Sequence, residues 1–224
     1  MIKKITGIAC LVHISLNLYF IFFQTPVERY MGITQKIMYI HVPSIITAYV
    51  ALGIAFFCSV FYLWKRQERF DIIAYAAMET GAVFCALALI TGSIWGKPTW
   101  NTYWTWDARL TLTLILFLIF IGYLLLRKFT GYGEQQARIS AVIAIIGTLD
   151  IPLIHLSVVW WRTLHQPSTI LSTQKNVIDQ PLMFMLVSSI IAFWLLLAYL
   201  IQNRVMLEMK TRAYYRKVAE LYAS

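Results

Sequence analysis

Residues 71–126 contain two long apolar segments joined by a tryptophan-rich stretch. The segments read DIIAYAAMETGAVFCALALITGSI (71–94) and RLTLTLILFLIFIGYLLL (109–126), and the stretch between them reads WGKPTWNTYWTWDA (95–108). Each segment is long enough to cross a hydrocarbon core of about 30 Å as a helix, at about 1.5 Å per residue. The pattern predicts two transmembrane helices with an aromatic loop between them.

The rest of the 224-residue chain has the same character. Hydrophobic residues make up 60% of it and charged residues 13%, a composition that indicates an integral membrane protein and excludes a soluble globular domain. Four further segments are long and apolar enough to cross a membrane, at 4–23, 39–64, 138–160 and 181–202. We therefore expect an all-α bundle of six transmembrane helices that forms a single domain, 1–224.

The basic residues predict the orientation of this bundle. Thirteen of the 19 fall on the side that holds both termini: Lys3, Lys4, Lys65, Arg66, Arg69, Arg127, Lys128, Arg138, Arg204, Lys210, Arg212, Arg216 and Lys217. The positive-inside rule then places both termini in the cytoplasm and the tryptophan-rich loop outside, which in a Gram-negative bacterium is the periplasmic side of the inner membrane. Topology and attraction to anionic lipid account for the net charge of +9 without a nucleic acid.

Two of the loop's tryptophans, Trp100 and Trp104, are four residues apart. In a helical segment their rings would lie on one face, with Tyr103 and Trp106 beside them. Such a shelf would present on the order of 400 Å² of apolar surface, and covering it would contribute roughly 10 kcal/mol. A flat apolar ligand is one candidate to cover it.

The alternative is an interfacial belt, because tryptophan and tyrosine are enriched where a membrane meets water. A belt needs one or two aromatic residues per helix end, whereas this loop has four tryptophans and a tyrosine. It also leaves unexplained the polar pair Asp107 and Arg109 and the placement of Gly96 and Pro98. We therefore favour a ligand site over an anchor.

Two histidines are predicted on the side of the tryptophan loop. His41 lies at the start of the second span and His165 lies in the loop after the fifth. Two neutral imidazoles converging over an aromatic shelf are what six-coordinate haem iron requires of a protein. A single interfacial histidine would more simply be a hydrogen-bonding residue. His155 and His13, within the spans, are second choices as ligands.

Two acidic residues, Glu79 and Asp150, lie deep in predicted spans. A carboxylate there must face the bundle interior, be protonated or find a partner. The sequence leaves open whether they form a proton or ligand pathway or make packing hydrogen bonds, with Thr80 and Thr148 nearby. Pro152 should bend the fifth span just beyond Asp150.

Several kinds of chemistry have no supporting motif. Cys10, Cys58 and Cys85 lie in apolar segments and form no Cys-x-x-Cys pair, which disfavours thiol redox chemistry. Residues 92–97 echo a phosphate loop, but the glycines are four apart and Pro98 replaces the required hydroxyl residue. We find no ATPase or hydrolase motif and expect a binding protein, not an enzyme.

The loop resembles the WWD signature of the haem-handling proteins of cytochrome c biogenesis. The matching residues are Trp95, Gly96, Trp100, Trp104, Trp106, Asp107, Arg109, Leu110 and Thr111. Six spans, about 220 residues and histidines in the flanking outer loops are similar to CcmC, the heme exporter protein C family of the system I pathway. Related families that share the signature are longer, with more spans.

The resemblance implies a function and partners. The loop would bind non-covalent haem b on the outer face through Trp95, Gly96, Trp100, Tyr103, Trp104, Trp106, Asp107 and Arg109, with His41 and His165 as axial ligands. Proteins of the family work with the transporter subunits CcmA and CcmB and the small protein CcmD, and present haem to the periplasmic chaperone CcmE. The alternative is a membrane transporter subunit or redox enzyme whose aromatic loop is only an interfacial anchor.

Overall fold

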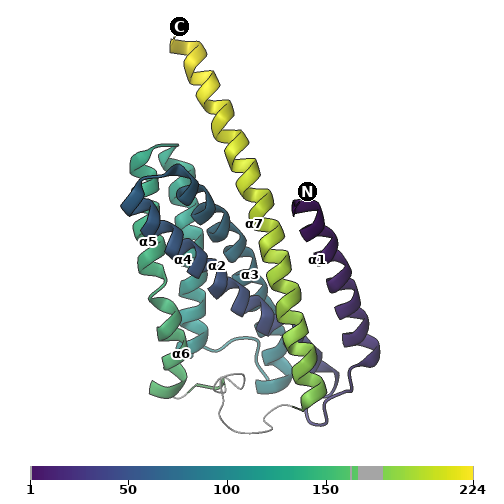
Figure 1. Cartoon of the computed structure of the whole chain (residues 1–224). Coiled ribbons are helices and arrows are strands. Elements are labelled where there is room, and N and C mark those ends of the chain that lie inside the picture. The colour runs from purple at the N-terminus through teal and green to yellow at the C-terminus, as the bar shows by residue number, and fades with distance from the viewer. Residues whose placement is uncertain (1, 162, 166–178, 224) are drawn as a thin grey trace.

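The computed structural model describes residues 2–161, 163–165 and 179–223, whose secondary structure is helical apart from one isolated bridge, Glu28–Gly32. The elements are α1 (Ile2–Tyr19), the π-helix η1 (Phe20–Gln24), the 3₁₀ helix η2 (Ile33–Ile37), α2 (Met38–Lys65), α3 (Glu68–Trp100), α4 (Ala108–Thr130), α5 (Glu134–Gly147), α6 (Asp150–Trp160) and α7 (Gln180–Ala223). Both termini lie at one end of the bundle and the α3–α4 loop lies at the other (Figure 1).

Six helical segments among the described residues are long and apolar enough to cross a membrane, which confirms the predicted all-α fold. They run Lys3–Gln24, Ile33–Lys65, Glu68–Trp100, Ala108–Thr130, Glu134–Trp160 and Gln180–Tyr222. The third and the last are longer than the sequence predicts. α3 continues through the tryptophan-rich stretch to Trp100, and α7 continues about twenty residues beyond 202.

α3 tolerates Pro98 because the proline sits in its last turn. Pro98 has no N–H to donate to the Ile94 carbonyl, so the helix loses one hydrogen bond just before it ends. The Thr99 hydroxyl donates to the next carbonyl, that of Trp95, at 2.8 Å. Asn101 then adopts a left-handed conformation, with φ of 58°, which ends the helix. Trp100 is therefore the last helical residue and Trp104 lies in the loop, so the expected helical stacking of these two rings is wrong.

The fifth span is interrupted, as Pro152 led us to expect, but the break falls before Asp150 and not beyond it. α5 ends at Gly147 and α6 begins at Asp150. Pro152 cannot donate to the Thr148 carbonyl, which instead accepts from the Ile151 N–H at 3.3 Å. The tighter hydrogen bonds of the 148–149 turn separate the two helices.

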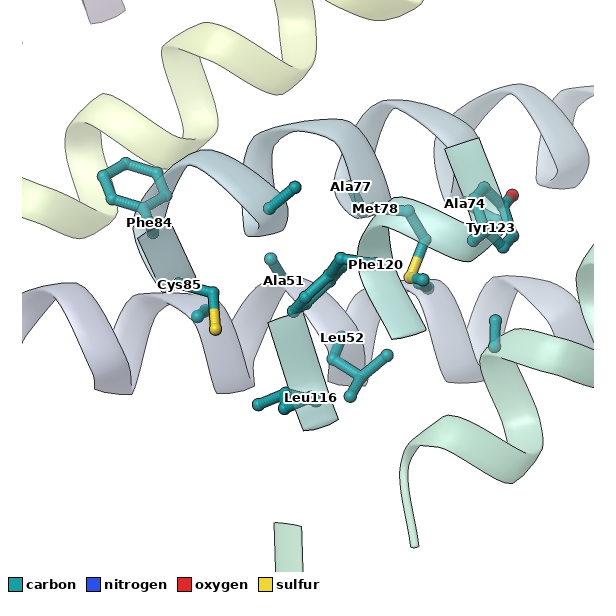
Figure 2. Packing of buried hydrophobic residues seen from close by; sticks show 14 of the residues in the cluster. Ala51, Leu52, Ala74, Ala77, Met78, Phe84, Cys85, Leu116, Phe120 and Tyr123 are labelled. Carbon is teal, nitrogen blue, oxygen red and sulfur yellow. The ribbon is translucent and has the colours of Figure 1, made fainter. Parts of the chain in front are cut away.

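α2 and α3 form the most extensive contact between two helices. The core lies where α4 packs onto this pair. Small side chains on both helices, such as Ala51 and Ala77, let their backbones approach closely. Phe120 of α4 lies between them (Figure 2). Gly81 makes this possible, because a Cβ there would lie 2.7 Å from the Phe120 ring.

α1 packs mainly against α7 (Figure 1). The Asn17 side chain donates to the Ser188 hydroxyl at 2.6 Å and accepts from the Ser189 hydroxyl at 2.8 Å. The His13 Nε2–H donates to the Ser188 carbonyl at 3.1 Å. His13 is thus a packing residue of the α1–α7 contact.

A buried ion network joins α3, α4 and α7 at the end of the bundle away from the tryptophan loop. Arg127 makes a bidentate pair with Asp71, at 2.6 and 2.9 Å, and Arg212 pairs with the same carboxylate at 2.6 Å. Glu79 pairs with Arg204. These contacts give α7 partners beyond residue 202, where hydropathy alone predicted its end.

Candidate functional site

A cavity opens at the tryptophan-loop end of the bundle, between α2, α3, α4 and the segment after α6. It contains about 900 Å³ of space free of protein atoms, including the open solvent at its mouth. Its lining is mostly apolar and aromatic: Met31, His41, Ile45, Tyr49, Ala88, Leu89, Gly92, Ser93, Trp95, Gly96, Thr99, Trp100, Trp104, Arg109, Leu110, Thr113, Leu164 and His165.

The two candidate axial ligands, His41 and His165, both line this cavity. They come from α2 and from the segment that follows α6, and they are close enough to interact electrostatically. The His165 ring lies edge-on to Trp100, with ring centroids 6.0 Å apart, and the His41 ring lies edge-on to Trp95 at 5.8 Å. Each histidine is therefore paired with a tryptophan of the signature.

His41 is held from one side by α3. Its Nδ1 lies 3.0 Å from the Ala88 carbonyl oxygen and 3.4 Å from the Thr91 hydroxyl. Gly92 lies directly against the ring, because a Cβ there would come within 2.8 Å of the His41 Cε1 atom. The ring is thus enclosed by one turn of α3 and the edge of Trp95.

Three signature tryptophans, Trp95, Trp100 and Trp104, contribute to the cavity wall. The indole nitrogens of Trp95 and Trp104 are buried and have no hydrogen-bond partner among the described residues. Gly96 lets the chain fold back over the wall, since a Cβ there would lie 3.2 Å from the Thr102 carbonyl oxygen and 3.3 Å from the Trp100 ring. The wall therefore combines apolar faces with two unused N–H donors.

Three other residues of the loop, Tyr103, Trp106 and Asp107, do not line the cavity. Trp106 is 76% exposed, and Tyr103 is 59% exposed with Lys97 over its ring. Asp107 caps α4: its carboxylate accepts from the Leu110 N–H at 3.0 Å and from a loop hydroxyl at 3.2 Å. The sequence did not reveal this division of the loop into an inward and an outward set.

Arg109 lines the cavity, and Asp107 interacts with its charge without forming a direct ion pair. The described residues contain no ion pair to Arg109, although its guanidinium interacts electrostatically with Tyr49. A guanidinium cannot lose its proton, so at the edge of a membrane it requires an anion or water. The cavity wall therefore includes a guanidinium that has no directly paired carboxylate among the described residues.

The other polar residues considered from the sequence lie away from this opening. His155 donates from Nδ1 to the Ile151 carbonyl of its own helix at 3.0 Å, and its ring contacts Tyr49. Asp150 is buried at the start of α6, with one carboxylate oxygen unpartnered among the described residues. Glu79 forms its ion pair with Arg204, so its partner is an arginine of α7 and not the neighbouring Thr80.

Sequence reasoning missed the ion network as a structural feature. Asp71 and Arg127 are almost completely buried. The sequence places Asp71 at the start of one span and Arg127 among the cytoplasmic residues just after another. Their positions 56 residues apart gave no local signal that they would meet. The only signal in the sequence was the group of basic residues after residue 203, which is larger than the positive-inside rule needs to orient the last span.

The cavity has the groups needed to hold a metal that arrives with its own equatorial ligands. Among the described residues no group of three or more His, Cys, Asp or Glu side chains could hold a bare metal ion. Two imidazoles on separate segments can supply the two axial positions of a planar chelate, and indole faces can cover its rings. An arginine can bind a peripheral carboxylate.

The chain is similar to known proteins over nearly its whole length. The family model described as heme exporter protein C matches residues 1–220. Heme exporter protein C of Bradyrhizobium diazoefficiens is 41% identical over 76% of this chain and 65% of its own length. Heme exporter protein C of Escherichia coli K12 is 37% identical over 84% of this chain and 77% of its own. The chain thus spans about two thirds to three quarters of these relatives, and it belongs to the heme exporter protein C family.

Proposed function

We propose that this protein binds haem b non-covalently in the cavity and passes it to a CcmE-like chaperone for cytochrome c maturation. The observation that carries the proposal is the presence of His41 and His165, from separate segments, in the wall of one aromatic cavity. Each would supply one axial ligand to the iron, while Trp95, Trp100 and Trp104 cover the porphyrin. Haem, if bound here, would supply an iron that these two imidazoles could hold.

Arg109 supports haem over an uncharged planar ligand. Its guanidinium lines the cavity and has no carboxylate partner among the described residues. A haem propionate would provide one in a charge-assisted hydrogen bond. Trp95 and Trp104, in the same wall, each have a buried indole N–H without a hydrogen-bond partner among the described residues, and these would be further donors. Lys97 is a weaker candidate, because its ammonium already donates to Asn101.

The outward set of signature residues suits a different role. Trp106 and Tyr103 are exposed and do not reach the cavity, so they are suited to the membrane interface. The anchor interpretation of the sequence thus applies to part of the loop, and ligand binding applies to the rest. A transporter subunit or redox enzyme with a purely anchoring loop would not need two histidines in the cavity.

Family membership and charge support the remaining proposals. The protein would lie in the bacterial inner membrane with the cavity on the periplasmic side, as the distribution of basic residues predicts. The CcmA and CcmB transporter subunits and the small protein CcmD would be its membrane partners. Any energy from ATP would come from a partner, since this chain has no nucleotide-binding motif.

The test is to purify the whole protein in lipid nanodiscs, load it with haem and mix it with the apo chaperone. We expect a six-coordinate low-spin spectrum on loading, and transfer of haem to the chaperone on mixing. Bovine serum albumin replaces the chaperone in the control and should accept haem more slowly. A protein that binds no haem under these conditions, or keeps it equally with chaperone and albumin, would contradict the proposal.

A further inference from the structure

We propose that one turn of α3, residues 88–92, positions His41 so that its Nε2 is the atom presented to the cavity. The Ala88 carbonyl determines which tautomer the neutral ring adopts, and Gly92 leaves the space that the ring occupies. The inference rests on the proposed function, because it assigns the ligating atom and the groups that orient it. Ala88 and Gly92 act through His41 and are positioning residues.

The hydrogen bonds of the ring determine its tautomer. A carbonyl oxygen can only accept, so the Nδ1 atom 3.0 Å from the Ala88 oxygen must carry the hydrogen. The Thr91 hydroxyl donates to the Leu87 carbonyl at 2.6 Å, which leaves its lone pairs free to face the same N–H at 3.4 Å. Nε2 is then unprotonated, as a metal ligand must be.

Sterics hold the ring in this place. A side chain at position 92 would put a Cβ 2.8 Å from Cε1 of His41, closer than real Cβ contacts allow, and 3.2 Å from Nδ1, which is tighter than most of them. Trp95 restricts movement of the imidazole on another side, since the centroids of the two rings are 5.8 Å apart. An alanine at 92 would therefore force the His41 ring away from the Ala88 carbonyl.

This arrangement places the turn that positions His41 and part of the tryptophan wall on one helix, α3. Gly92 lies one turn before Gly96 and two turns before Trp100, so α3 sets the ring of His41 relative to the wall that covers the porphyrin. A hydrogen bond from Nδ1 to an acceptor also makes the imidazole a stronger donor to the metal. Stronger donation stabilises ferric iron and lowers the reduction potential.

The first experiment compares Gly92→Ala with Gly53→Ala in haem-loaded protein in nanodiscs. Gly53 is in the same helix as His41 and has no atom within 4 Å of its Cβ position, so it is the matched control. Alanine is a better helix former than glycine, so propensity does not disfavour either variant. We expect Gly92→Ala to lose six-coordination as His41→Ala does, imidazole to restore it in both, and Gly53→Ala to match the wild type.

The second experiment measures the reduction potential of Thr91→Val and Thr91→Ser. Valine has nearly the shape of threonine but removes the hydroxyl, so we expect the potential to rise. Serine restores the acceptor and should return the potential to that of the wild type. A purely structural role for Thr91 would leave the potential of the valine variant unchanged. This pair also decides the matter if Gly92→Ala does not insert.

Failure of this inference can be told from failure of the proposed function. If His41→Ala loses six-coordination but Gly92→Ala keeps the wild-type spectrum, the positioning turn is refuted and His41 remains a ligand. If Gly92→Ala does not insert and Thr91→Val keeps the wild-type potential, the inference is also refuted. If His41→Ala itself keeps a six-coordinate spectrum, the ligand assignment fails.

Discussion

Replacement of Trp100 and Trp104 by alanine should weaken haem binding about 30- to 150-fold. An indole with one face against a flat ligand removes about 100 Å² from water, half of what a fully buried tryptophan covers. Two such faces are worth about 5 kcal/mol at about 25 cal/mol per Å². Because Trp100 already contacts His165 and Gly96, we expect about half of this, roughly 2–3 kcal/mol, to be lost.

The assay is a haem titration of the purified double variant in nanodiscs, with binding followed by absorbance. The matched control replaces Trp106 and Tyr103 by alanine, because both are exposed and lie outside the cavity. We expect the control to bind haem within about threefold of the wild type, a difference of under 1 kcal/mol. If the control loses affinity and the Trp100, Trp104 variant keeps it, the inward wall does not bind the ligand and the reasoning is refuted.

Three further predictions test other parts of the structure. Arg109→Gln should weaken haem binding about tenfold or more, since a charge-assisted hydrogen bond is lost, but should not affect binding of a haem whose propionates are esterified. Asp71→Asn should lower the free energy of unfolding by about 3–5 kcal/mol, seen as an earlier thermal transition, because it leaves the buried Arg127 without its carboxylate partner. On a background without the three native cysteines, Asn101→Cys should react with an impermeant thiol reagent from the periplasm and Gln67→Cys only from the cytoplasm, and the reverse result would overturn the topology.

Much of the fold was predictable because hydropathy depends on local sequence. The six apolar segments identify the spans, and each prediction overlaps a helix of the structure. The errors occur where hydrogen bonds and ion pairs replace hydropathy. α3 continues through Lys97 and Pro98 to Trp100, with the Thr99 hydroxyl donating to the Trp95 carbonyl in its last turn. α7 continues past 202 since Arg212 reaches Asp71 on α3.

The candidate site was predictable in outline for a different reason. Placing His41 and His165 on the same side of the membrane requires only the order of the spans, and the structure brings both to one cavity. The direction in which a loop side chain points depends on tertiary contacts, so the outward position of Trp106 could not be predicted from the sequence. The helix cap at Asp107 could have been predicted, because an aspartate just before an apolar helix is a common signal for a helix start.

The most direct test of the account is the haem spectrum of the His41→Ala, His165→Ala double variant beside the two single variants. Each single variant should bind haem that is five-coordinate or reduced in amount, and added imidazole should restore part of the six-coordinate signal by filling the empty axial position. The double variant should not retain haem through purification, although it inserts normally in the membrane. A double variant that purifies with a six-coordinate haem spectrum would contradict the central claim, and His155 would then be the next ligand to test.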